Sequence, residues 1–220
     1  GSTTALINVF TNLFIGISLG ANVLAARFYA AGKDREMSET VHTSITLALI
    51  SGIMMAVIGV LLAKWALEIM GTPDDVIGQS ALYMRIYFMG MPFFMLYNYG
   101  AAILRAIGDT KRPLIFLIIS GIANAALNMI LVILFHMGVA GVAIGTIISQ
   151  LISCVLVLTC LYRSEGSYQL RFSKLKINGA YMEQIFQVGV PAGIQSTVIN
   201  FSNVLLQSSV NSFGSIAMAG

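Results

Sequence analysis

Long stretches without a single charged side chain constrain this chain most. A helix needs roughly twenty predominantly apolar residues to cross about 30 Å of hydrocarbon. Stretches of that order recur at residues 3–26, 43–63, 86–104, 114–135, 139–161 and 185–213. A soluble domain is about a quarter charged, whereas this chain of 220 residues is 10% charged and 57% hydrophobic. We therefore expect an all-α fold, a polytopic bundle of transmembrane helices.

Basic residues alternate between the links that join these stretches. The links at 27–42, 105–112 and 162–183 are rich in lysine and arginine, whereas the links between them are poor in both. Cytoplasmic loops carry an excess of these residues, so we place the three basic links in the cytoplasm and the chain in the inner (plasma) membrane. This topology puts Gly1 outside without a signal peptide, and the last residues, SIAMAG, begin a further apolar stretch. We expect a fragment of a longer protein.

The link at 164–183 is the most polar part of the chain. It is the best candidate for a boundary between two lobes, with an N-lobe at 1–163, a cytoplasmic linker at 164–183 and the start of a C-lobe at 184–220. Its basic residues could contact anionic lipid headgroups. Alternatively, the linker is solvated and only sets the topology.

Polar side chains recur at helical spacing inside three stretches, so each set lies on one helix face. The sets are Thr4, Asn8 and Asn12; Ser120, Asn124 and Asn128; and Ser196, Asn200, Asn203, Gln207 and Asn211. A single asparagine is explained by hydrogen bonding between helices, but three striped helices favour a water-accessible central cavity. We expect seven amides to line it: Asn8, Asn12, Asn124, Asn128, Asn200, Asn203 and Gln207.

Prolines and glycines predict bends, turns and close packing. Pro92 and Pro191 should kink their helices, while Gly108 and Asp109 favour a turn with Pro113 in the first turn of the next helix. Glycines within the stretches should let helices approach closely. They are Gly16, Gly20, Gly52, Gly59, Gly121, Gly141 and Gly145.

Reactive residues argue against an enzyme or a metal site. All nine acidic residues lie in links or at the edges of stretches, so no carboxylate is available in mid-membrane for ion coupling. His42 and His136 lie at opposite membrane faces, and Cys154 and Cys160 point apart on one helix. The basic residues lie in links rather than on one helix face, which excludes nucleic acid as a partner. We expect no catalytic residue, metal ligand or bound cofactor.

Four strings carry a family resemblance: GISLGANVLAARFYAAGK (16–33), LRAIGDTKRP (104–113), GVAGVAIGTIISQ (138–150) and VGVPAGIQ (188–195). In this order the chain resembles the multidrug and toxic compound extrusion (MATE) family over essentially its whole length. The resemblance implies a transporter of two six-helix lobes, of which this chain is the second to seventh helices. It also implies export of small organic, often cationic compounds by alternating access, driven by a proton or sodium gradient. As partners we expect small-molecule substrates and membrane lipids, and we expect a monomer.

The resemblance also suggests a weak ion site. Some members hold the ion with an Asn and, four residues later, an Asp on the fifth helix, together with a Thr on the sixth. Asn128 and Thr146 match the Asn and the Thr, but Val132 stands where the Asp is expected. A flippase of lipid-linked saccharides, which would need a basic cavity, remains an alternative. So does a non-transporting membrane scaffold, which would bury the polar stripes in helix contacts.

Overall fold

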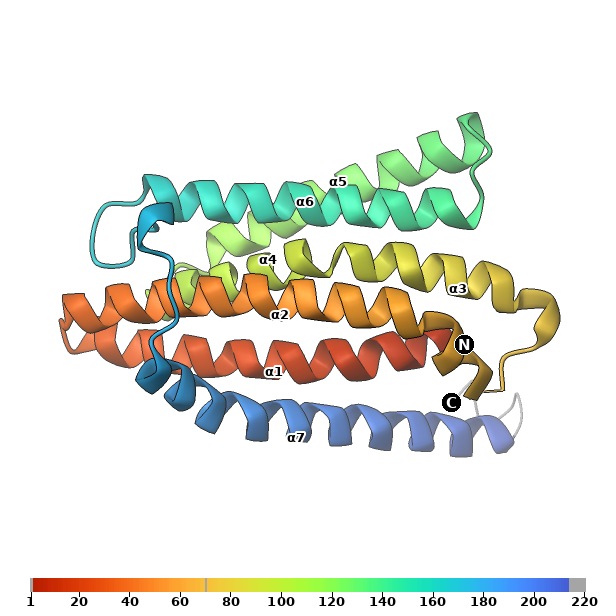
Figure 1. Cartoon of the computed structure of the whole chain (residues 1–220), viewed down its shortest axis with the longest axis horizontal. Coiled ribbons are helices and arrows are strands. Elements are labelled where there is room, and N and C mark those ends of the chain that lie inside the picture. Colours follow the sequence, from red (N-terminus) through yellow and green to blue (C-terminus); the bar gives the residue numbers. More distant parts are fainter. Residues whose placement is uncertain (1, 70, 214–220) are drawn as a thin grey trace.

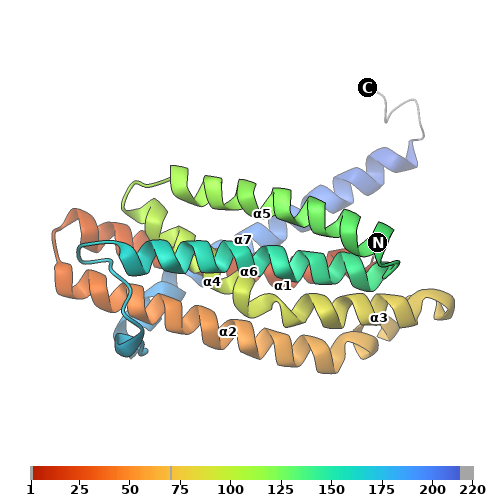
Figure 2. The ribbon, with the colours of Figure 1, turned by 90° about the horizontal axis from the view of Figure 1, so that it is seen from above.

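The computed structural model describes residues 2–69 and 71–213, and these residues fold as an all-α bundle (Figures 1 and 2). The long helices are α1 (Ser2–Ala30), α2 (Asp34–Ile69), α3 (Asp74–Met89), α4 (Met91–Ala106), α5 (Lys111–Met129), α6 (Val139–Arg163) and α7 (Gly179–Ser212). A π-helical turn (Ile130–Leu134) follows α5, and a 3-10 helix (Phe172–Lys174) lies in the linker before α7. The side chains of Thr4 and Asn211, from the predicted stripes, lie outside the described residues. The predicted helical-bundle class is confirmed.

The helices make this a multi-pass membrane protein. Among the described residues, four helical segments are long and apolar enough to span: Thr11–Ala30, Asp34–Ile69, Lys111–Leu134 and Val139–Arg163. The helices also run past the uncharged stretches, because backbone hydrogen bonding does not stop where the hydrocarbon ends. Thus α2 has 36 residues and begins nine positions before the expected stretch at 43–63.

The expected single stretch at 86–104 is instead divided between two helices of 16 residues each, α3 and α4, which follow one another along the chain. The break is at Gly90, just before Pro92, whose ring removes a backbone donor. A Cβ added to Gly52 of α2 would lie 2.5 Å from the Cα of Pro92, so α2 and α4 pack backbone to backbone there. The predicted bend at Pro92 is confirmed, whereas α7 continues as one helix through Pro191.

Helices α2 and α4 are central. α2 packs against α3 and α4, α4 also packs against α1 and α6, and α5 lies outside against α6. The Tyr97 hydroxyl of α4 donates a 2.9 Å hydrogen bond to the Pro113 carbonyl at the start of α5. Exposed aliphatic side chains such as Leu61 and Ile122 cover the outer faces, as expected of helices in contact with lipid.

The linker between α6 and α7 is packed rather than loose. Leu170 is fully buried, and its backbone N–H donates to the Leu161 carbonyl at the end of α6. The rings of Tyr162 and Phe172 stack with their centroids 5.7 Å apart. In Figure 1 the linker crosses the ends of α1 and α2 before it enters α7.

Candidate functional site

Helices α1 and α7 meet along a glycine seam. Gly16 and Gly20 of α1 face Gly189 and Gly193 of α7, a Gly-x-x-x-Gly pair on each helix. A Cβ added to Gly16 would lie 2.1 Å from the Cα of Gly193, so the two backbones touch. Such small-residue seams are a usual way for membrane helices to associate. The packing role predicted for Gly16 and Gly20 is confirmed, and the partner glycines were not predicted.

The amides of these two helices lie beyond the glycine seam. α1 ends and α7 begins at links that the charge pattern assigns to the cytoplasm, so the seam occupies the cytoplasmic half of the pair. Further along, α7 carries Asn200, Asn203 and Gln207, all exposed. On α1, Asn8 is exposed and Asn12 is half-buried. The pair is thus closely packed in one half and lined with amides in the other.

A second pair of predicted amides lies between α5 and α6. The Oδ1 atoms of Asn124 and Asn128 are buried and accept no hydrogen bond from any described residue. A Cβ on Gly145 of α6 would lie 2.6 Å from Asn128 Oδ1, so only glycine leaves room for this amide. A buried acceptor without a donor costs free energy. A water molecule, a metal cation or a cationic group of a substrate would satisfy these two oxygens.

The residues suggested for an ion site lie on neighbouring helices. Thr146 follows Gly145, and its Oγ1 donates a 3.0 Å hydrogen bond to the Val142 carbonyl, which leaves the oxygen lone pairs available. Val132 lies in the π-helical turn, a local form that is frequent at functional sites. Among the described residues, the amide oxygens of Asn124 and Asn128 and the Thr146 hydroxyl offer neutral oxygens here.

The seven amides therefore fall into two groups, one on α1 and α7 and one between α5 and α6. The structure packs α5 against α6 and α4, whereas α7 packs against α1 and α2. That all seven line one cavity stays a prediction. Asn22, on the same helix as Asn8, donates a 2.8 Å hydrogen bond to the Ala102 carbonyl and joins α1 to α4.

Four further buried polar atoms lack a described partner and were not predicted: Thr11 Oγ1, Thr72 Oγ1, Tyr99 Oη and Gln150 Oε1. Each stands alone in its helix or link rather than in a repeating stripe, so periodicity could not single it out. Gln150 lies against the helix break, because a Cβ on Gly90 would be 2.6 Å from its Oε1.

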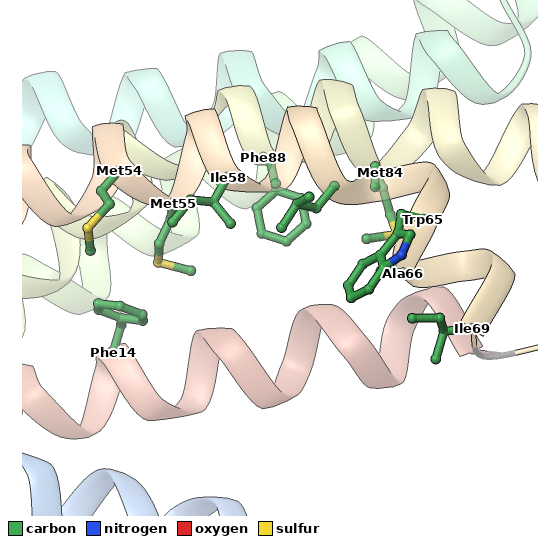
Figure 3. Close-up of a pocket in the computed structure, with 12 residues that line it drawn as sticks. Phe14, Met54, Met55, Ile58, Trp65, Ala66, Ile69, Met84 and Phe88 are labelled. Atoms are coloured by element: carbon green, nitrogen blue, oxygen red, sulfur yellow. The ribbon is translucent and has the colours of Figure 1, made fainter.

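An apolar cavity of about 390 Å³ opens between α1, α2 and α3. Figure 3 shows Phe14 of α1 across from Met54 and Met55 of α2, with Trp65 extending from α2 towards α1. Methionine and aromatic side chains adapt to varied apolar shapes. The cavity can accommodate an apolar or aromatic group but presents almost nothing that would fix its orientation.

The described residues contain no group of three or more His, Cys, Asp or Glu side chains that could hold a metal ion. Cys154 and Cys160 are both free thiols. The site chemistry is therefore that of amides, hydroxyls and apolar surfaces.

A family model described as MatE matches residues 1–130. The chain is 34% identical over 214 residues to the probable multidrug resistance protein YoeA of Bacillus subtilis (strain 168), covering 93% of this chain and 46% of that protein. It is 25% identical over 209 residues to the multidrug export protein MepA of Staphylococcus aureus (strain bovine RF122 / ET3-1), covering 94% of this chain and 46% of that protein.

Solved structures agree on the fold. The crystal structure of a MATE protein in complex with MaD5 superposes with a TM-score of 0.86 at 19% identity, over 98% of this chain and 50% of that one. The chain thus spans about half the length of the relatives it matches.

Proposed function

The chain belongs to the MatE family, and on this premise we propose that the full protein is a secondary active efflux transporter of small organic, often cationic compounds. It works as a monomer in the plasma membrane by alternating access, coupled to a proton or sodium gradient. The names of the relatives, multidrug resistance and multidrug export proteins, support export as the direction.

One structural relationship carries the proposal. The α1–α7 pair is closed by the glycine seam in its cytoplasmic half and bears amides in its outer half. A passage shut on one side and polar on the other is what one state of an alternating-access transporter requires. In the opposite state the seam separates and the outer halves approach. Because the seam is backbone against backbone, it can part without leaving a polar side chain unpaired.

Asn124 and Asn128 are the proposed contacts for the coupling ion or a cationic substrate group. Their buried amide oxygens have no described donor, and Thr146 lies on the facing helix. Uncharged oxygens offset little of an ion's desolvation cost, so we propose that a carboxylate elsewhere in the full protein completes the coupling site.

The direct test uses the full-length gene in cells that lack their own efflux pumps. Cells with the wild-type protein should retain less cationic dye than cells with empty vector, and Asn128→Ala should restore retention. Gln79→Ala, an exposed amide outside the stripes, is the matched control and should export like wild type. Collapse of the proton gradient or removal of sodium then identifies the coupling ion. Equal dye retention with wild-type protein and empty vector would refute the proposal.

A further inference from the structure

A cavity of about 640 Å³ lies at the cytoplasmic end of the bundle, between the start of α2 and the linker that precedes α7. Thr43, which lines it, is also the first residue of the uncharged stretch of α2. The cavity therefore lies where the hydrocarbon gives way to the headgroups of the cytoplasmic leaflet. The proposed transport cycle does not use it.

Specific hydrogen bonds hold the linker to α2 and so shape the cavity. His42 Nε2 accepts a 3.1 Å hydrogen bond from the Arg171 backbone N–H, and Nδ1 lies 2.6 Å from the Ser38 carbonyl. Seven residues after Arg171, just before α7 begins, the Asn178 backbone N–H donates a 3.2 Å hydrogen bond to Thr43 Oγ1. Helix α2 thus forms one wall of the cavity, and the linker, held by these hydrogen bonds, forms the other.

Positive charge is in excess around this cavity. Arg35, Lys174 and Lys176 line it, with Glu39 as the one lining carboxylate. Glu39 is already engaged, because its Oε1 lies 3.5 Å from Arg35 Nε and its Oε2 accepts a 3.0 Å hydrogen bond from Asn178 Nδ2. Within the described chain neither lysine has an ion-pair partner.

Tyr181 at the start of α7 also lies near the acidic groups of α2. Burial raises the pKa of the Tyr181 phenol, and the carboxylates of Glu39 and Glu36 raise it further. Glu36 does not line the cavity. The unpaired ammonium groups of Lys174 and Lys176 therefore remain to face a ligand, beside Arg35, which is paired with Glu39.

We propose that this cavity binds the phosphate of an anionic phospholipid headgroup from the cytoplasmic leaflet. Basic pockets between transmembrane helices on the cytoplasmic side recognise such headgroups. The occupant contacts α2 through Arg35 and the linker through Lys174 and Lys176, so it holds the linker between the lobes against an N-lobe helix. Lipid composition then influences how freely α7 moves relative to α2.

The test titrates the purified full-length protein with phosphatidylglycerol and counts bound lipids by native mass spectrometry. Phosphatidylcholine and inorganic phosphate form the comparison arms. Wild type should bind phosphatidylglycerol in preference to phosphatidylcholine. The double variant Lys174→Gln/Lys176→Gln should lose roughly five-fold in affinity for each lysine removed, whereas Lys174→Arg/Lys176→Arg should keep the binding.

Lys111→Gln is the matched control, since it removes one exposed positive charge from another cytoplasmic link. It should bind like wild type, and all variants should elute alike in size exclusion. Unchanged phosphatidylglycerol binding in the double glutamine variant would overturn the proposal. An equal loss of phosphatidylglycerol binding in Lys111→Gln would also overturn the proposal, because it would mean that the lipid is attracted to the basic surface in general and not to this cavity. Competition by inorganic phosphate at the concentration of the lipid would overturn the assignment to a lipid.

Discussion

The backbone N–H of Arg171 donates a hydrogen bond to the ring nitrogen Nε2 of His42, 129 positions earlier in the chain. His42 is 3% exposed, and its Nδ1 lies 2.6 Å from the Ser38 carbonyl, so Nδ1 donates and Nε2 accepts. This arrangement requires the neutral imidazole with its proton on Nδ1. The bond fixes the linker to the N-terminal helices.

His42→Ala should therefore loosen the linker. We expect faster tryptic cleavage after Arg171 and Lys174, because a protease needs the segment to leave α2. His136→Ala, which changes an exposed histidine at the other end of the bundle, should cleave like wild type. Slow cleavage of His42→Ala would show that the linker is held without this bond.

The close packing of α1 and α7 at the glycine seam leaves no room for a methyl group in place of a glycine hydrogen. In Gly193→Ala the new Cβ would lie 2.6 Å from the Leu13 carbonyl oxygen, so the helices must separate. We expect a loss of about 1–3 kcal/mol of stability, measured as thermal unfolding in detergent. Gly121→Ala is the control, since a Cβ there meets nothing within 4 Å and alanine favours a helix. The seam is unimportant if both variants unfold at the same temperature.

Two neighbouring tyrosines should respond oppositely to loss of the hydroxyl. Tyr97→Phe removes the hydrogen bond to the Pro113 carbonyl and should cost about 0.5–1.5 kcal/mol. The Tyr99 hydroxyl is buried without a described partner, so Tyr99→Phe should be neutral or stabilising. Thermal unfolding of both variants beside wild type checks this, and destabilisation by Tyr99→Phe would mean that its hydroxyl has a partner in the full protein.

Gly145→Ala should impair transport by displacing Asn128, whose Oδ1 would lie 2.6 Å from the new Cβ. We expect a several-fold loss of dye efflux in the full-length protein with membrane expression unchanged. Gly78→Ala, in a helix with open space around the glycine, should transport normally. Wild-type efflux by Gly145→Ala would remove Asn128 from the proposed ion or substrate contact.

The turn LRAIGDTKRP (104–113) could be predicted from its residue types alone. Gly108 has φ +90°, which favours glycine, and the Arg112 backbone N–H donates to Asp109 Oδ1 at 3.1 Å. Pro113 lies in the first turn of α5, as predicted. All of these contacts join residues a few positions apart, so the residue types suffice to indicate them.

Membrane residence and the helical fold followed from the sequence by itself, because in lipid a long uncharged helix satisfies its own backbone hydrogen bonds. The expected sidedness also followed, because cytoplasmic links carry an excess of lysine and arginine. The polar faces of the helices also followed, since helical spacing determines which residues share a face. The residues that these faces contact could not be predicted from the sequence. The order in which the helices pack decides these contacts. Examples are Gly16 with Gly193, Asn128 with Gly145, and His42 with Arg171. Only the tertiary structure decides such contacts, because they join residues far apart in the chain through helix surfaces that look interchangeable in the sequence.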